Sequence, residues 1–288
     1  MLQDKAMLCN LRLSCWTGEK SDSMLGREVS SRKKAENGSV TAVVRMIPQH
    51  HLKPIRAIDA KIRAAHHHHT LPWLDDGARI LPTAAFFDHS NAISGLLQER
   101  EVAVETFLRH YPTIREDARI HLGELYTDDM WPHSVRARFT AQVAHLPIPD
   151  GSDFRVNMEP SELERLREGV EQAVRGQVHQ AMGSVRLRIH NVLSNFVDRI
   201  KDYETVNTPE GEKVVGIFRN SVMDNVASLA DILPKLNLTD DPEVAEAARE
   251  IKANITAHSV DALRDSDDLR RTVMEEANKL LSKFGKKA

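Results

Sequence analysis

Apolar residues recur at helical spacing between Leu163 and Ile200, and this run restricts the possible folds more than any other feature of the chain. Consecutive members are all three or four residues apart, so they share one face of a single long helix. They are Leu163, Leu166, Val170, Val174, Val178, Met182, Val185, Ile189, Val192, Phe196 and Ile200. The mean step of about 3.7 is closer to an eleven-residue repeat than to a heptad, which favours a straight packing partner over a left-handed coiled coil.

Proline and charge placement set the limits of this helix at about residues 160 and 203. Pro160 suits a first helical position, acidic residues gather in the first turns, and Arg199 and Lys201 lie near the end, which matches the helix dipole. A helix of about 40 residues is roughly 60 Å long, more than a compact domain needs. We therefore expect it to pair with another helix or with a partner. The predicted interaction residues are Val178, Met182, Val185, Ile189 and Phe196.

Three glycines interrupt the same segment at intervals of seven residues: Gly169, Gly176 and Gly183. Each costs up to about 1 kcal/mol relative to alanine inside a helix, so their repetition invites a physical reason. Two explanations stay open at this point. Either the glycines allow another helix to approach closely, or they form a local weak point in the long helix.

The remaining pattern predicts a mainly α chain of the α+β class. Alternating apolar residues at Cys9–Cys15 and Phe139–Val143 predict strands of a small antiparallel sheet, accompanied by helices in the N-terminal half. Helical spacing after residue 210 predicts a long helical hairpin or bundle in the C-terminal half. We expect an α+β domain over residues 1–157, with a basic first quarter, and a helical domain over residues 158–288 that contains the long helix.

Prolines and turn residues mark the ends of further elements. The apolar stripe at Ile55–Ala65 predicts one helix. A second helix follows Pro82 and ends at Pro112, since proline disrupts a helix interior. The apolar residues of Val215–Leu233 predict another helix, and residues 154–156 suit a return strand.

Composition and residue placement favour a cytoplasmic protein without a membrane segment. The chain has 288 residues, 41% of them apolar, yet no apolar run reaches the ~18 residues that span a bilayer. Asp4 and Asn10 interrupt the apolar core that a signal peptide requires. Cys9 and Cys15 would lie about 20 Å apart in an extended strand, too far to form a disulfide there. We expect both to be small buried hydrophobic residues in a reducing compartment.

Positive charge is concentrated in the first quarter of the chain. Residues 1–72 contain 12 Lys+Arg and 6 Asp+Glu, a net +6, whereas the whole chain carries −3. Such a segment can follow a phosphate backbone. Charge runs are commonly only solvated faces, however, and few aromatic residues alternate with these cations to stack on bases. The candidate nucleic-acid contacts are Arg32, Lys33, Lys34, Arg45, Lys53, Arg56, Lys61 and Arg63.

The common catalytic motifs are missing from the sequence. The chain lacks a phosphate-binding glycine loop, a dinucleotide fingerprint, an HExxH zinc motif and a CxxC pair. Glu250 and Lys252 have the E-x-K spacing of some nucleases, but Glu250 falls in a predicted helix rather than a strand. We therefore expect a protein that is not an enzyme, with no catalytic residue and no cofactor.

Four consecutive histidines are the sharpest local feature. Neutral imidazole is the commonest nitrogen ligand of metals such as zinc, so the candidate metal ligands are His66, His67, His68 and His69. Adjacent residues of one helix point about 100° apart, whereas a structural zinc site needs converging ligands. A solvated helix end, or adventitious metal binding, is the favoured interpretation.

Several motifs together suggest a family. The first three are Leu13-x-Cys15-Trp16-Thr17-Gly18-x-Lys20-x-Asp22, Thr70-Leu71-Pro72-Trp73-x-Asp75-x-Gly77-x-Arg79-x-Leu81-Pro82 and Phe107-x-x-x-Tyr111-Pro112. The C-terminal half adds Pro234-x-Leu236-Asn237, Asp241-Pro242, Leu263-Arg264 and Arg270-Arg271. With these motifs, nearly the whole chain resembles an uncharacterised family encoded mainly by tailed phages and prophages. Cys15, where serine is expected, and the four histidines before Thr70 depart from the family pattern.

The resemblance implies an accessory role, because some such genes lie near genes for a MoxR-type AAA+ ATPase and a von Willebrand factor A protein. We expect a phage or prophage protein that acts in the host cytoplasm through protein–protein interaction, as an adaptor of a MoxR-type AAA+ ATPase module. The alternative is a nucleic-acid-binding protein of phage DNA metabolism that uses the basic N-terminal segment. Self-association through the long helix is a further expectation.

Overall fold

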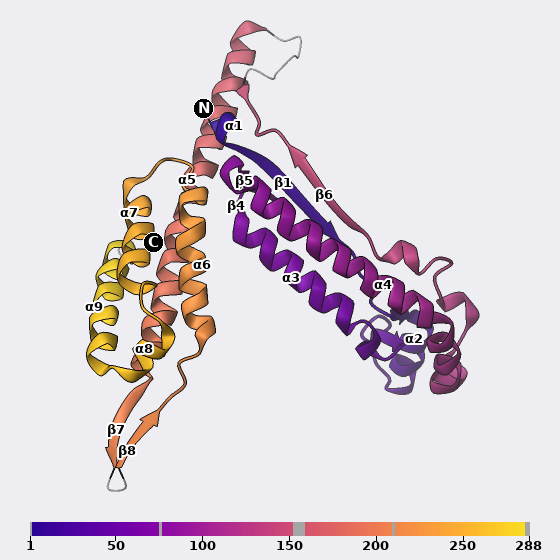
Figure 1. The fold of residues 1–288 in the computed structure, drawn as a ribbon. Helices are drawn as coiled ribbons and strands as arrows, with labels where there is room; N and C mark the ends of the chain where they lie inside the picture. The colour runs from indigo at the N-terminus through magenta and orange to yellow at the C-terminus, as the bar shows by residue number, and fades with distance from the viewer. Residues whose placement is uncertain (1, 75–76, 152–158, 209–210, 286–288) are drawn as a thin grey trace. The chain divides into compact units, whose positions relative to one another are not determined.

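The chain forms two compact units, each assembled from separated segments (Figure 1). The computed structural model describes residues 2–74, 77–151, 159–208 and 211–285. Unit 1 consists of residues 1–10, 67–89 and 144–288, and unit 2 consists of residues 11–66 and 90–143. The expected division between residues 157 and 158 does not coincide with this one, because Leu71 and Ile80 share a hydrophobic core with the C-terminal helices.

Helices dominate both units, as the sequence predicts. The α-helices are α1 (Leu2–Lys5), α2 (Ser23–Arg32), α3 (Lys53–His69), α4 (Phe86–Leu122), α5 (Pro160–Lys201), α6 (Asn220–Leu236), α7 (Pro242–Glu250), α8 (Val260–Asp265) and α9 (Asp267–Phe284). A π-helical segment, Ile251–Ile255, continues α7. The long helix α5 confirms the prediction for the C-terminal half. Within the described ranges, none of the helices has the length and apolar character needed to cross a membrane.

The strands form one small sheet and two ribbons. They are β1 (Ala6–Leu13), β2 (Glu19–Asp22), β3 (Ala42–Arg45), β4 (Leu71–Pro72), β5 (Ala78–Pro82), β6 (Ala141–Leu146), β7 (Glu204–Thr208) and β8 (Gly211–Val215). The sheet has the strand order β4-β5-β1-β6, with β5 antiparallel to β1 and to β4. The pairs β2–β3 and β7–β8 are antiparallel ribbons. The small antiparallel sheet expected for the N-terminal half is therefore present.

The core of unit 1 is built around the second half of α5. Val185, Ile189 and Phe196 are fully buried there, in one cluster with residues of α6, α7 and α9. Figure 1 shows α6 beside this part of α5, and α5 also packs against α9. The apolar stripe that predicts the helix is thus the stripe that builds the core.

The core of unit 2 is aromatic, and it changes one predicted helix end. Trp16 lies 6.0 Å from Tyr111 and 6.1 Å from Trp131 between ring centroids. Helix α4 continues through Pro112 to Leu122 instead of ending at the proline. Ile114 and Ala118, just beyond the proline, are buried in the same cluster. Tertiary packing therefore outweighs the local cost of proline, about 3 kcal/mol in a helix interior.

Two further predictions for the C-terminal half need correction. Val215 ends strand β8 rather than beginning a helix, because residues 204–215 form the β7–β8 ribbon. The sequence also predicts that this helix ends at Pro234, but Pro234 lies inside α6, which ends at Leu236, a fully buried residue. The return strand predicted at residues 154–156 falls outside the described residues.

Candidate nucleic-acid interface

Helix α3 separates its apolar and its charged residues onto two faces. Its buried residues are Ile55, Asp59, Ile62 and His66, spaced four, three and four apart. The four cations of this helix, Lys53, Arg56, Lys61 and Arg63, are all exposed and spread over about 160° of the helix circumference away from the buried residues. We call these four residues the α3 cationic face. Ala57, Ala60 and Ala64 are also exposed, so small side chains separate the cations and leave the helix surface accessible.

The single acidic residue of α3 is neutralised inside unit 2. The Arg100 Nε donates to the Asp59 Oδ1 at 2.6 Å, and the two side chains are 3% and 2% exposed. A second nitrogen of Arg100 donates to the Ser14 carbonyl oxygen at 2.6 Å. The Asp59 carboxylate is therefore buried and paired with Arg100. It does not offset the positive charge of the α3 cationic face.

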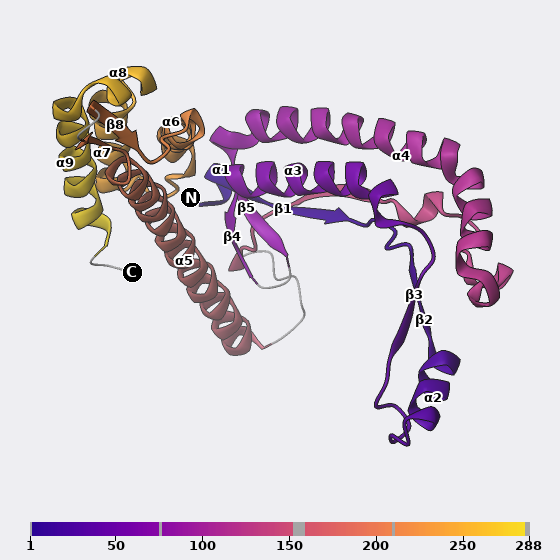
Figure 2. The same cartoon turned by 90° about the horizontal axis from the view of Figure 1, so that it is seen from below.

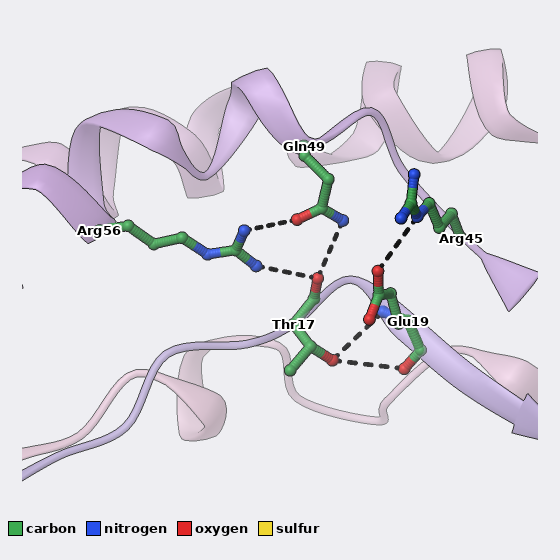
Figure 3. Close-up of polar contacts among 5 residues, drawn as sticks. All are labelled: Thr17, Glu19, Arg45, Gln49 and Arg56. Atoms are coloured by element: carbon green, nitrogen blue, oxygen red, sulfur yellow. Dashed lines mark hydrogen bonds and ion pairs between the residues drawn. The ribbon is translucent and has the colours of Figure 1, made fainter. Parts of the chain in front are cut away.

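Arg56 also anchors the start of α3 to the loop before β2 (Figure 3). Its guanidinium donates to the Thr17 carbonyl oxygen at 3.1 Å and to the Gln49 side-chain oxygen. The Gln49 amide donates to the same Thr17 oxygen at 3.1 Å. Arg56 therefore has a structural role, and Lys53, Lys61 and Arg63 remain the candidates for contacting a ligand.

Arg45 on β3 is held by a weaker contact. Its Nε lies 3.3 Å from the Glu19 Oε1 across the β2–β3 ribbon (Figure 3). The Arg45 side chain is 75% exposed. Exposed ion pairs of this kind contribute about 0 to 1 kcal/mol, so the pair positions Arg45 loosely.

The other three predicted contacts lie apart from α3. Arg32 ends α2 and pairs with Glu28 one turn earlier at 2.6 Å, and Lys33 and Lys34 follow it in an exposed turn. Lys34 has a φ of 55°, in the left-handed region. Figure 2 shows α2 at the far end of the β2–β3 ribbon from α3. The eight candidates therefore divide into the α3 cationic face, a separate cationic tip at Arg32–Lys34, and Arg45 at the other end of the ribbon, where it pairs with Glu19.

The net charge of unit 2 agrees with an anionic ligand. Its two segments, residues 11–66 and 90–143, contain 17 Lys+Arg and 13 Asp+Glu, a net +4 in a chain of net −3. The excess comes from the first segment, which contains α2 and α3. A local excess of cations raises the concentration of anions near the surface and accelerates their association.

The histidine tract ends α3 and is tied to α5 by Arg188. In unit 1, Arg188 nitrogens donate to the carbonyl oxygens of His67 and His68, each at 2.8 Å. Burial, then His69 and Arg188, lower the pKa of His68 to about 4. Burial, then Arg79 and Arg188, lower the pKa of His67. The guanidinium groups of Arg79 and Arg188 disfavour protonation of His67 and His68. The bonds from Arg188 also cap the last carbonyl groups of the helix, so the helix end is not simply solvated.

The four histidines also differ in exposure. His66 is buried, His67 is exposed, and His68 and His69 are half-buried. The rings of His68 and His69 lie 4.8 Å apart between centroids in a T-shaped arrangement. The tract is therefore a helix end whose histidines range from buried to exposed, which its uniform sequence does not reveal.

The predicted interaction residues on α5 need correction. Val185, Ile189 and Phe196 are 0% exposed, and Met182 is 7% exposed. Val178 is half-buried and lines a surface cavity of about 540 Å³ with Arg175 and other residues. In this fold the stripe builds the core of unit 1, so four of the five residues are not available as a partner surface.

The E-x-K pair is also structural. The Lys283 Nζ lies 3.1 Å from the Glu250 Oε1, and the Lys252 Nζ lies 2.7 Å from the Asp231 Oδ1. Glu250 ends α7, and Lys252 is in the π-helical segment that follows it. Each side chain therefore joins neighbouring helices of unit 1, and the two pairs do not share a partner.

Sequence reasoning missed the buried contact of Arg100 and the half-buried contacts of Arg188. Arg100 lies 41 residues from Asp59, and Arg188 lies 120 residues from His68. No local spacing signals such contacts, since they depend on the tertiary fold. The comparisons with known proteins add no functional assignment: no protein-family model matches the chain, and neither a curated protein nor a solved structure matches it.

Proposed function

We propose that this protein binds the phosphate backbone of double-stranded nucleic acid through the α3 cationic face. One observation carries the proposal: Lys53, Lys61 and Arg63 are exposed on a helix whose single acidic residue is buried and paired. Lys53 and Arg63 are ten residues apart, about 15 Å along the helix. At roughly 3.4 Å per phosphate along one strand, this length matches about four phosphates.

The composition of α3 favours backbone contacts over base recognition. The helix contains no Phe, Tyr or Trp, so it offers no stacking platform of the kind that single-strand binders use. Lys and Arg contacts to phosphate position a protein on nucleic acid but carry no sequence information. We therefore expect affinity that depends strongly on salt and weakly on base sequence.

A triple variant tests the proposal. Replacing Lys53, Lys61 and Arg63 with glutamine removes three phosphate contacts without adding acidic charge. The plot of log K against log salt then becomes shallower by about 2.7, since each contact contributes about 0.9. Fluorescence anisotropy with a labelled duplex of random sequence, measured over a salt series, gives both the slope and the affinity. We expect affinity at low salt to fall more than about tenfold.

The matched control removes the same charge elsewhere. Arg199, Arg219 and Arg249 are exposed residues of unit 1, and their joint replacement with glutamine changes the net charge of the chain equally. This variant retains the original slope if α3 is the interface. Equal losses in both variants, or no duplex binding by the unchanged protein, contradict the proposal.

A second candidate function uses a protein partner. The resemblance to the phage family supports an adaptor of a MoxR-type AAA+ ATPase, and the first half of α5 offers apolar residues that are not in the core. Leu166 is 39% exposed, and Leu163 and Val170 are half-buried. This surface replaces the buried stripe as the place where a partner helix could pack.

Affinity purification from the native or infected cell separates the two candidates. The tagged full chain is recovered with and without nuclease, followed by mass spectrometry and the absorbance ratio at 260 and 280 nm. An AAA+ ATPase retained after nuclease treatment supports the adaptor. Recovery of partners only without nuclease, together with high absorbance at 260 nm, supports nucleic-acid binding and contradicts the adaptor.

A further inference from the structure

The first half of α5 carries an apolar face that extends beyond the core of unit 1, and the last residue of this face, Val174, packs against that core. Leu163, Leu166, Val170 and Val174 are spaced three, four and four residues apart, on one side of the helix. The first buried residue of α5 is Ala181, about 30 Å along the helix from Pro160. We call these four residues the α5 leading face. Figure 2 shows this part of α5 running beyond the other helices of unit 1.

Glycines beside the α5 leading face leave room for a second helix. A Cβ added at Gly169 or at Gly176 would meet no described atom within 4 Å. The cost of glycine in a helix is therefore not offset by close packing among the described residues. The sequence left two explanations open, close approach by another helix and a local weak point. If another helix does approach these glycines, it comes from outside the described residues.

We infer that the partner is a second copy of this chain, packed antiparallel along the α5 leading face. In such a pair a two-fold axis passes beside Val170, and residues equally distant from Val170 lie opposite each other. Leu166 of one copy then faces Val174 of the other, and Val170 faces itself. A face that is apolar at every one of these positions is self-complementary, as a two-fold interface requires.

The charges that border the α5 leading face favour the antiparallel direction. Glu164, Arg167, Glu171 and Arg175 lie along one border. In the antiparallel pair, Arg167 comes within about two residues of the second copy's Glu171, and Glu164 within about one residue of its Arg175. In a parallel pair this border would instead face the opposite border of the second helix, where Gly169, Ala173 and Gly176 offer no charged partner.

The same side chains are free to exchange partners on assembly. Within one helix, Arg175 lies 3.0 Å from Glu171 and Arg167 lies 3.8 Å from Glu164. All four side chains are between 39% and 75% exposed. Exposed pairs of this kind contribute about 0.3 to 0.5 kcal/mol, so replacing them with pairs between two copies costs little.

Sedimentation and light scattering of the full chain test the inference. We expect a mass of twice 32.5 kDa at high concentration. The double variant Leu166→Asp/Val170→Asp shifts the dimer to monomer, with a dissociation constant raised by about 100-fold or more. Leu187→Asp is the matched control, because Leu187 lies on the same helix and is 49% exposed outside this face. Circular dichroism verifies that each variant retains its helices.

Cysteine cross-linking tests the direction of the pair. In a Cys15→Ser background, Val170→Cys forms a disulfide-linked dimer, whereas Leu163→Cys does not link to itself, because the two copies of residue 163 are about 20 Å apart. A mixture of Leu163→Cys and Gln177→Cys chains links. Self-linking of Leu163→Cys shows a parallel pair. A monomer at all concentrations, or a dimer unaffected by Leu166→Asp/Val170→Asp, overturns the inference, whatever the outcome for nucleic acid.

Discussion

Replacing Arg100 with alanine is expected to lower the free energy of unfolding of unit 2 by about 3 to 5 kcal/mol. The change leaves the Asp59 carboxylate buried without its cation, and it also removes the donor to the Ser14 carbonyl oxygen. An uncompensated buried charge costs far more than the loss of an exposed pair. Because Asp59 belongs to α3, we expect the α3 cationic face to become mobile as well.

Urea denaturation followed by tryptophan fluorescence measures this effect. A Trp73→Phe background leaves Trp16 and Trp131, both of which are buried in unit 2. The control is the double variant Asp59→Leu/Arg100→Met, which replaces both charges with apolar groups and recovers most of the lost stability. A loss below about 1 kcal/mol for Arg100→Ala would show that the pair is not isolated from water.

Replacing Phe196 with alanine is expected to lower the free energy of unfolding of unit 1 by about 3 to 5 kcal/mol. The Phe196 side chain is fully buried, and its ring lies 6.0 Å from that of Phe218 in an edge-to-face arrangement. The variant loses both the apolar contact area and the aromatic pair, and the helices around it close the cavity only partly.

Urea denaturation by circular dichroism, with hydrogen exchange in α6 and α9, measures the loss in unit 1. Leu187→Ala on the same helix is the control, and we expect it to cost less than about 1 kcal/mol because Leu187 is 49% exposed. Similar stability of both variants would contradict the central place of α5 in the core. That result would also make the apolar residues of α5 around Phe196 candidates again for a surface that binds a partner.

Long periodic elements were predictable from the sequence, because their pattern is local. The stripe from Leu163 to Ile200 predicts α5 almost to its ends, since Pro160 and the late basic residues mark both limits. The β7–β8 ribbon and the passage of α4 through Pro112 were not predictable in the same way. Both depend on pairing or packing with distant residues, which outweighs local preference.

The candidate site was predictable in part for the same reason. Lys53, Lys61 and Arg63 stand out as cations in the sequence, and the stripe of α3 places them away from its buried residues. The sequence could not show that Arg56 binds Thr17 or that Asp59 is neutralised by Arg100. Periodicity also could not distinguish a buried stripe on α5 from a partner surface, because both are apolar at the same spacing.

The division of the chain into interleaved units has a consequence for its synthesis. The chain passes between the units near residues 10, 66, 89 and 143. Unit 2 has all of its residues once residue 143 leaves the ribosome, whereas β5 and the first residues of β1 wait for α5 to α9. At about 5 to 20 residues per second, that wait lasts roughly 7 to 30 s. During it Leu8 and Ile80, later buried, lack the helices of their core, so these apolar side chains stay exposed to solvent until the C-terminal helices are made.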